Sequence, residues 1–310
     1  MGRRSRKGDP VHGWVIVDKP KDVTSTQVVG IVRRAFNAQK AGHGGTLDPL
    51  ASGVLPIALG EATKTVPYTM DALKAYEFTV RFGEERNTDD LEGEITHESD
   101  VRPSRDALIA ALPDFVGDVE QVPPRFSAIK VKGERAYDLA RSGEEVELKS
   151  RSVYIERLEF IDWLDPSHAK MRMICGKGTY VRSLARDLGR KLGTFGTIAD
   201  IRRTMVGPFD AADATPLLSL KDLGDSPPPQ GSLHPVEMAL DGIPALSLVE
   251  RDAQRLRSGN PVRMTRLMAA DLAPFDREED PVIYATSAGK VVALAEIAQG
   301  EVRPVRVFNL

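Results

Sequence analysis

A short run of small residues near the start of the chain constrains the fold more than any other feature. Residues 41–53 hold the loop-forming residues Gly42, Gly44, Gly45, Pro49 and Gly53. Glycines at this density, with a proline among them, exclude a long helix or strand and predict a loop with tight turns. One carboxylate, that of Asp48, stands directly before the proline, which restricts the backbone of the residue preceding it. The chain must therefore fold around a sharply bent loop that presents a single acid.

Hydrophobic patterns on either side of this loop predict a strand, a helix and a second strand. Residues 13–17 form a short apolar run that is typical of a strand. Thr24 or Ser25 can cap the helix that follows, because residues 28–36 place apolar side chains at helical spacing. Residues 53–60 form an apolar run bounded by glycines, and the proline within it favours an edge strand or a bulge.

The middle of the chain mixes strand and helix patterns. Residues 75–82 carry aromatic and apolar side chains on one strand face, and residues 152–161 and 170–175 also have strand patterns. Ser104 can cap a helix that runs to about residue 112, and residues 180–192 carry an apolar stripe at helical spacing. These elements follow no regular βαβ order, so an α+β body is expected rather than a doubly wound sheet.

A proline-rich stretch, Pro227–Pro229, separates this body from a smaller unit. Beyond about residue 246 the pattern predicts one helix over 249–257 and short strands near 282–284 and 291–297. This unit is therefore expected to be small and mostly β. The predicted division has three parts, which are a basic tail over residues 1–12, a large domain over 13–245 and a small domain over 246–310.

Composition excludes several classes of protein. The 310 residues are 41% hydrophobic, as in an ordinary globular protein. The only cysteine, Cys175, permits neither an intramolecular disulfide nor a multi-cysteine zinc site, and the histidines show no HExxH-like pairing. No apolar run has the length of a signal peptide or membrane span, so a cytoplasmic protein without membrane contact is expected. The net charge of −3 argues mildly against a nucleic-acid binder, although a basic groove can lie on an acidic body.

The residues alone leave two interpretations of Asp48. A loop of small residues lets a substrate approach closely, which suits a carboxylate that does chemistry. The same carboxylate can instead bond its own backbone in an Asx-turn. The loop lacks the Lys-Ser/Thr pair of a Walker A loop, so it does not predict nucleotide binding.

The run Gly42–Gly53 resembles the active-site motif of the TruB family of tRNA pseudouridine synthases. Other runs resemble further motifs of that family in the same order, namely Gly13–Pro20, Gly60–Lys64, the strand bearing Tyr76, Pro123–Lys130, Gly178–Leu184 and Ile201–Thr204 with Gly207–Phe209. The resemblance covers about residues 13–209. It implies an α+β catalytic domain with a mixed, largely antiparallel sheet flanked by helices and loops. Residues 246–310 resemble the family's PUA-like RNA-binding module more weakly, in size and order of elements.

The resemblance implies an isomerase that converts uridine 55 in the T loop of tRNA to pseudouridine. The base leaves its sugar at N1, turns and rejoins through C5, so no cofactor or metal is expected. The implied partner is tRNA, contacted at its T arm and elbow, from which the target base must be flipped out. Residues 123–150 resemble the family's insertion against the T arm, and the chain is expected to act as a monomer.

The resemblance implies three catalytic residues in this chain. Asp48 corresponds to the nucleophile, and aspartate needs no separate base because it is ionised at neutral pH. Arg182 corresponds to the arginine that pairs with this aspartate. From spacing alone Arg182 also fits a solvent-facing arginine, because Arg186 and Arg190 follow at i+4 spacing. Tyr76 would stack on the extruded base and assist proton removal from C5, although it shares a strand face with core residues.

The resemblance also implies contacts to the substrate. Tyr180 and Ile201 would line the pocket, His43 would help to open the T loop, and Lys19 would support the floor of the site. Basic side chains are expected to contact the RNA, mostly its phosphates, and they are Lys64, Arg125, Lys130, Lys132, Arg135 and Arg202. Five arginines of the small domain are expected to do the same, namely Arg251, Arg255, Arg257, Arg263 and Arg266.

Two other functions stay open at this point. A protein that binds or folds tRNA without catalysis would need the same surfaces. A glycoside hydrolase usually needs two carboxylates that flank the bond, and the glycine loop provides one, so this function ranks low.

Overall fold

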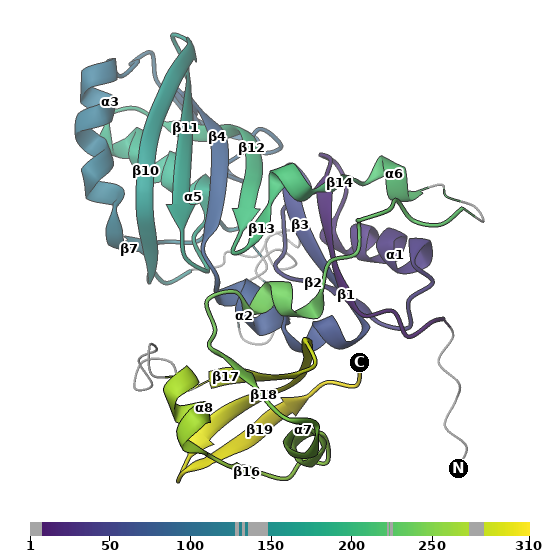
Figure 1. Cartoon of the computed structure of the whole chain (residues 1–310). Helices are drawn as coiled ribbons and strands as arrows, with labels where there is room; N and C mark the ends of the chain where they lie inside the picture. The colour runs from purple at the N-terminus through teal and green to yellow at the C-terminus, as the bar shows by residue number, and fades with distance from the viewer. Residues whose placement is uncertain are drawn as a thin grey trace.

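The computed structural model describes residues 8–127, 130–131, 134–135, 148–221, 223, 226–272 and 282–310. These residues form a ten-stranded sheet, a five-stranded sheet and two small two-stranded pairs. In Figure 1 the five-stranded sheet lies below the large one and is coloured green to yellow. The predicted α+β class is confirmed.

The large sheet is mixed and mostly antiparallel, as expected. Its main path follows the order β14-β1-β3-β12-β4-β11-β10-β7, while β13 pairs with β12 and β2 with β3. Only the pairs β1–β14 and β3–β12 of this sheet are parallel among the described strands. Its strands are β1 Gly13–Lys19, β2 Ala41–His43, β3 Ser52–Leu59, β4 Lys74–Phe82, β7 Gly117–Gln121, β10 Arg151–Asp165, β11 His168–Cys175, β12 Gly196–Val206, β13 Phe209–Asp210 and β14 Thr215–Pro216.

Short helices flank this sheet. α1 begins where predicted, because the Thr24 side chain accepts a bond from the Gln27 backbone and the Gln27 side chain bonds back to the cap. α5 packs against β12 and β4 and lies behind the sheet in Figure 1. The α-helices here are α1 Ser25–Ala35, α2 Val66–Asp71, α3 Arg105–Ala111, α5 Val181–Lys191 and α6 Leu218–Lys221. The 3-10 turns are η1 Gly60–Lys64, η2 Leu112–Phe115, η3 Ala211–Asp213 and η4 Val236–Leu240, and the small pairs are β5 Glu84–Arg86 with β6 Ile95–Glu98 and β8 Lys130–Val131 with β9 Glu134–Arg135.

The second sheet has the order β15-β17-β18-β19-β16 and a hydrophobic core of its own. A separate apolar cluster joins it to the large sheet, where Trp14 and Leu240 meet Leu294 and Phe308. No helix of the described residues is long and apolar enough to cross a membrane. The elements are β15 Ala245–Ser247, α7 Glu250–Arg257, β16 Val262–Arg263, α8 Arg266–Asp271, β17 Val282–Ser287, β18 Lys290–Ala298 and β19 Glu301–Val307.

Several predictions of local structure were wrong or incomplete. β12 was not predicted as a long strand, because charged residues interrupt its apolar pattern, and β19 was missed altogether. β3 is neither an edge strand nor bulged at Pro56. On the side away from β1, its pairing with β12 ends at Gly53 and its pairing with β2 begins at Ile57, so the proline lies between two partners. Residues 41–43 form a short strand instead of a loop.

Candidate active site

The glycine-rich loop lines a small cavity at the centre of the large sheet. The cavity measures about 90 Å³ and lies between this loop, β4, β12 and the start of α5. Typical small-molecule sites are about 300–1,000 Å³, so it fits only part of a ligand, such as one base. Its lining includes all the residues predicted to surround the base, together with their neighbours, namely Thr46, Leu47, Asp48, Ala51, Tyr76, Thr179, Tyr180, Val181, Arg182 and Ile201.

Close packing against the sheet explains the glycines of the loop. Gly53 has φ +104°, and a Cβ there would collide with the backbone carbonyl of Arg203 on β12. A Cβ at Gly44 would lie 2.6 Å from the Thr69 hydroxyl oxygen. Next to Asp48, the Ser25 hydroxyl donates to the Leu47 carbonyl and accepts from the Leu47 N–H, both at 2.9 Å. The loop is therefore fixed against α1 and β12.

The Lys19 side chain is bonded to the backbone of this loop. Its buried ammonium donates to the carbonyls of Pro20, Val23 and Pro49, at 2.8, 2.9 and 3.2 Å. Pro49 directly follows Asp48, so this bond holds the backbone beside the acid. Burial lowers the pKa of Lys19 to about 8, and the nearby Asp48 opposes this change.

The structure brings Asp48 and Arg182 together. The Nη2 of Arg182 lies 2.8 Å from Oδ2 of Asp48, and the arginine side chain is buried while the carboxylate is 35% exposed. The solvent-facing alternative for Arg182 is therefore wrong. The other nitrogen, Nη1, pairs with Asp90 at 3.1 Å. Burial opposes the charge of Arg182, but Asp48 and Asp90 outweigh burial and raise its pKa.

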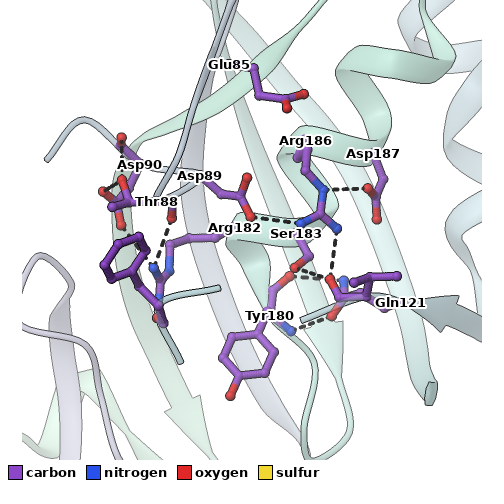
Figure 2. A network of polar contacts seen from close by, with 12 residues as sticks. Glu85, Thr88, Asp89, Asp90, Gln121, Tyr180, Arg182, Ser183, Arg186 and Asp187 are labelled. Carbon is purple, nitrogen blue, oxygen red and sulfur yellow. Dashed lines mark hydrogen bonds and ion pairs between the residues drawn. The ribbon is translucent and has the colours of Figure 1, made fainter. Parts of the chain in front are cut away.

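Two more arginines of α5 pair with acids in the same way, which was not predicted from the sequence, and Figure 2 shows the first of them, Arg186 with Asp89. Arg186 pairs with Asp89 at 2.9 Å, and Arg190 pairs with Glu85 at 2.6 Å. Arginines at i, i+4 and i+8 on one helix face thus meet three acids from residues 84–90. Asp89 has φ +60°, a left-handed turn that lets it face the same helix as Asp90. The spacing of the arginines and the acidic loop were both visible in the sequence, but not their proximity.

Aromatic and apolar side chains form the other walls of the cavity. Tyr76 extends from β4, and Ile201, which is 4% exposed, faces it from β12. The Tyr180 backbone is fixed at the start of α5, because its N–H donates to the Gln121 side chain at 2.8 Å and its carbonyl accepts from it at 3.0 Å. Figure 2 shows these two hydrogen bonds at the first turn of the helix. The Arg151 guanidinium lies over the Tyr180 ring, 5.2 Å from its centroid.

Arg203 on β12 was not predicted as a site residue, yet its side chain holds the glycine-rich loop. It donates to the carbonyls of Val54, Thr46 and Gly45, at 2.8, 3.2 and 3.2 Å, and it is 2% exposed. The signal was available, because residues two apart share a strand face. Once Ile201 was assigned to the pocket, Arg203 and not Arg202 had to lie on the same face.

Three of the predicted substrate contacts lie away from the cavity lining. Arg202 forms a double ion pair with Asp18, at 3.0 Å for both nitrogens, because it points to the opposite face of β12. The Lys64 ammonium is bonded to Glu61 and to the Val307 carbonyl, so it joins η1 to β19 instead of being free for phosphate. His43 ends β2 and does not line the cavity, and burial, followed by Arg203, lowers its pKa.

The other predicted RNA contacts are only partly described. Arg125 is exposed at the end of the described segment before residue 128. Lys132 lies outside the described residues, and the side chains of Lys130 and Arg135 are not described. On the small domain, Arg257 pairs with Glu250, while Arg255 donates to the Pro261 carbonyl at 3.0 Å. Arg251, Arg263 and Arg266 are exposed.

The donor set at the cavity does not favour a metal ion. No group of three or more His, Cys, Asp or Glu residues able to hold a metal occurs in the described ranges. The acids nearest to Asp48 and Arg182 are engaged in ion pairs with arginines. The chemistry that this site offers is that of a half-exposed carboxylate beside aromatic walls.

Two family profiles match the chain and together span residues 33–241. The profile of the TruB family pseudouridylate synthase N-terminal domain matches residues 33–181, and that of the tRNA pseudouridylate synthase B C-terminal domain matches residues 182–241. Three similar proteins are each named tRNA pseudouridine synthase B. The protein of Bradyrhizobium diazoefficiens is 55% identical over 99% of this chain and 88% of its own length. Those of Dinoroseobacter shibae and Caulobacter vibrioides are each 54% identical, over 100% of this chain and 99% and 100% of their own lengths.

Solved structures share the fold over nearly the whole chain. A chain in an H/ACA RNP bound to a substrate RNA containing 2′-deoxyuridine superposes with a TM-score of 0.72 and 21% identity, over 100% of this chain and 92% of that one. A chain of the archaeal box H/ACA sRNP Nop10–Cbf5 complex gives 0.69 and 22%, over 99% and 93%. At these identities the likeness concerns the fold alone.

Proposed function

This chain belongs to the TruB family of pseudouridylate synthases and is a tRNA pseudouridine synthase, and we propose that Asp48 is the nucleophile with which it converts uridine 55 of the T loop. The reaction only rearranges atoms. The bond from C1′ of the sugar to N1 of the base breaks, and a bond from C1′ to C5 forms. A carboxylate can hold the detached fragment covalently while the base turns.

One observation carries the assignment of Asp48, namely its ion pair with the buried Arg182. The 2.8 Å contact fixes the position of the carboxylate, while 35% of its side chain stays exposed beside the cavity. An Asp48 in an Asx-turn would instead bond its own backbone. The dry wall formed by Ile201 and Tyr76 limits capture of the intermediate by water, which would release the base as a hydrolysis product.

RNA binding is proposed to use surfaces on both sides of the cavity. The target uridine must be flipped out of the tRNA elbow, because the cavity is too small for more than one base. Arg125, beside the Arg182-bound segment that ends at Ser127, is proposed to contact the T arm. The exposed arginines of the small domain, such as Arg251 and Arg263, are proposed to contact phosphates, which makes binding weaken as salt rises. The Asp48–Arg182 pair and the walls of the cavity all come from one copy of the chain, and we propose that a monomer acts, in the cytoplasm.

The test is incubation with a T-arm hairpin, followed by mapping of the uridine that changes. The wild type is expected to modify one uridine, whereas Asp48→Asn should lose at least about 10³-fold in rate and keep its affinity for tRNA. Asp71→Asn is the control, because Asp71 is an exposed aspartate paired with Lys177 on the surface. Pseudouridine formation by Asp48→Asn would refute the nucleophile. Binding without modification by the wild type would favour a tRNA-folding protein, and free uracil as the main product would favour a hydrolase.

A further inference from the structure

Tyr180 lines the cavity from a place where its own helix gives it little support. It stands just before the first turn of α5, in an extended backbone conformation, and within the described residues of that helix it makes no side-chain capping bond. A residue at this point is usually a short polar one that caps the helix. An aromatic wall must also be held still if a base is to stack on it. The support for Tyr180 must therefore come from other elements.

Gln121 supplies this support to the backbone of Tyr180. It is 3% exposed at the end of β7, and its side chain accepts from the Tyr180 N–H at 2.8 Å and donates to the Tyr180 carbonyl at 3.0 Å (Figure 2). An amide side chain carries both a donor and an acceptor, so it can bond both backbone groups of one residue. The place from which the Tyr180 ring extends is therefore set by β7.

Arg151 holds the same tyrosine by its ring. It begins β10 and is the direct register partner of Gln121, so the two side chains lie on one face of the sheet. Its guanidinium lies over the Tyr180 ring, 5.2 Å from the centroid, and its Nη2 donates to the Gly178 carbonyl at 2.6 Å. A guanidinium in such a contact covers one face of the ring, which leaves the other face for a base.

The remaining donor of Arg151 indicates that the ring contact matters for its placement. The Nε atom is buried and has no hydrogen-bond partner among the described residues. An unpaired buried donor costs free energy and calls for an explanation. An arginine that served only to tie the chain together would be expected to pair this donor as well. The guanidinium is instead placed by the Tyr180 ring and the Gly178 carbonyl together.

Gln121 and Arg151 stand where residues 122–150 leave and rejoin the large sheet. β7 ends at Gln121, and β10 begins at Arg151. The next residue after β7 is also bonded to α5, because the Val122 carbonyl accepts from two side chains of that helix, each at 2.8 Å. The strand ends that frame this segment thus also hold the wall of the cavity.

We propose that Gln121 and Arg151 are positioning residues for the isomerisation, which act through Tyr180 and set the ring face on which the flipped-out base stacks, an inference that rests on the proposed function. Gln121 fixes the backbone of the tyrosine, and Arg151 fixes the plane of its ring. Neither belongs to the cavity lining, so neither needs to touch the base. A misplaced wall should slow the rearrangement and leave RNA affinity nearly intact, because that affinity comes mainly from phosphate contacts.

The first experiment observes the ring without RNA. A fluorotyrosine replaces Tyr180, and its fluorine NMR signal reports the surroundings and mobility of the ring. Arg151→Met and Gln121→Met are both expected to shift or broaden this signal, because the first frees the ring and the second frees the backbone. An unchanged signal in either variant overturns the role given to that residue, whatever the protein does to RNA.

Two matched controls keep the same chemical change away from Tyr180. Arg157→Met removes an exposed arginine from the same strand as Arg151. Gln39→Met removes a glutamine that also bonds the backbone, through the Gly8 carbonyl at 2.9 Å. Both controls should leave the fluorine signal and the rate on the T-arm hairpin as in the wild type. A control that changes the signal as much as its matched variant would overturn the assignment.

The second experiment asks whether Arg151 acts through the ring. On the T-arm hairpin, Arg151→Met should lower the single-turnover rate about tenfold and change the affinity by less than about twofold. In a Tyr180→Leu background, which lacks the ring, the same change should cost nothing further. A full loss in both backgrounds would mean that Arg151 contacts RNA or supports the fold directly, and it would overturn the inference.

Gln121 is tested by the same kinetics. Gln121→Met should lower the single-turnover rate about tenfold with nearly unchanged affinity, because it releases the backbone that carries the ring. An unchanged rate, or a loss that appears only in affinity, would overturn its role. Thermal unfolding is measured first, and if Gln121→Met does not fold, Gln121→Glu carries the comparison, because it keeps the acceptor and loses the donor.

Discussion

The two buried arginines at the active site, Arg182 and Arg203, are held in opposite ways. Arg182 lies between two carboxylates, those of Asp48 and Asp90, so its charge is balanced where it stands. Arg203 donates to three backbone carbonyls, and within the described ranges it forms no ion pair with an acid. We refer to the arginines of α5 with their acids as the carboxylate side, and to Arg203 with Lys19 and Lys74 as the carbonyl side.

The difference separates two tasks of one active site. Charge-assisted bonds between arginine and carboxylate are short and directional, so the carboxylate side fixes the position of Asp48, the proposed nucleophile. The cations of the carbonyl side donate to backbone carbonyls, so this side holds the chain around that acid in place. The glycine-rich loop lies between the two sides, where Lys19 bonds to the Pro49 carbonyl and Arg203 bonds to the Gly45 carbonyl.

Removing the central arginine of the carboxylate side should have the largest effect. Arg182→Met frees Asp48 and leaves Asp90 buried without its arginine. We expect single-turnover modification of the T-arm hairpin to fall by about 10³-fold or more, because the proposed nucleophile Asp48 loses its orientation. The free energy of unfolding should fall by about 3–5 kcal/mol, as for other buried pairs that lose one partner. A variant that keeps more than about a tenth of the wild-type rate would contradict the role given to Arg182.

The sequence predicted the carboxylate side better than the carbonyl side, for a physical reason. Asp48 and Arg182 were identified through motif resemblance, and the structure places them 2.8 Å apart. Helix α1, strand β4 and the small β domain followed from periodicity and capping alone. Such features depend on residues close together in the chain, which a single sequence displays directly.

Contacts between distant segments could not be predicted in this way. The pairing of Asp89 with Arg186 depends on how residues 84–90 run beside α5, which no local pattern encodes. Arg203 was overlooked because β12 mixes charged and apolar residues and did not read as a long strand. Arg202 was chosen in its place, yet its side chain points to Asp18 on the other face. The hydrogen bonds of Arg203 to backbone carbonyls involve no acidic side chain that a sequence pattern could pair with it.

The stability that the carbonyl side contributes should rise with pH in the alkaline range. The pKa of Lys19 is about 8 in the folded protein against 10.5 when unfolded, so between these values the unfolded chain binds more protons. Stability contributed by this group must then increase as pH rises through that range. We expect the wild type to gain up to about 3 kcal/mol in free energy of unfolding relative to Lys19→Met between about pH 8 and pH 10. Urea unfolding of both proteins measures this difference, and a constant difference would refute it.

The stability that the carboxylate side contributes should change with pH in the acid range, and it should fall as pH rises. Burial raises the pKa of Asp89 from 3.8 to about 6, and Arg186 only partly opposes it. Between these values the folded protein binds more protons, so stability contributed by Asp89 is lost as pH rises. Relative to Asp89→Asn, the wild type should lose about 2–3 kcal/mol between about pH 4 and pH 6. Thermal unfolding across this range tests it, and a wild type that instead gains stability would show that Arg186 outweighs burial.

The outermost pair of the carboxylate side, Arg190 with Glu85, should contribute least to stability and activity. Arg190 and Glu85 repeat the geometry of Arg182 and Asp90 two helical turns away, but the Arg190 side chain is 53% exposed. Solvent screens such a pair, so Arg190→Gln should cost about 1 kcal/mol or less in free energy of unfolding. The rate on the T-arm hairpin should be unchanged, because Arg190 contacts neither the cavity lining nor the partners of Asp48. If Arg190→Gln lowers the rate on the T-arm hairpin, the whole row of arginines on α5 helps to orient Asp48. An unchanged rate confines that role to the buried pairs.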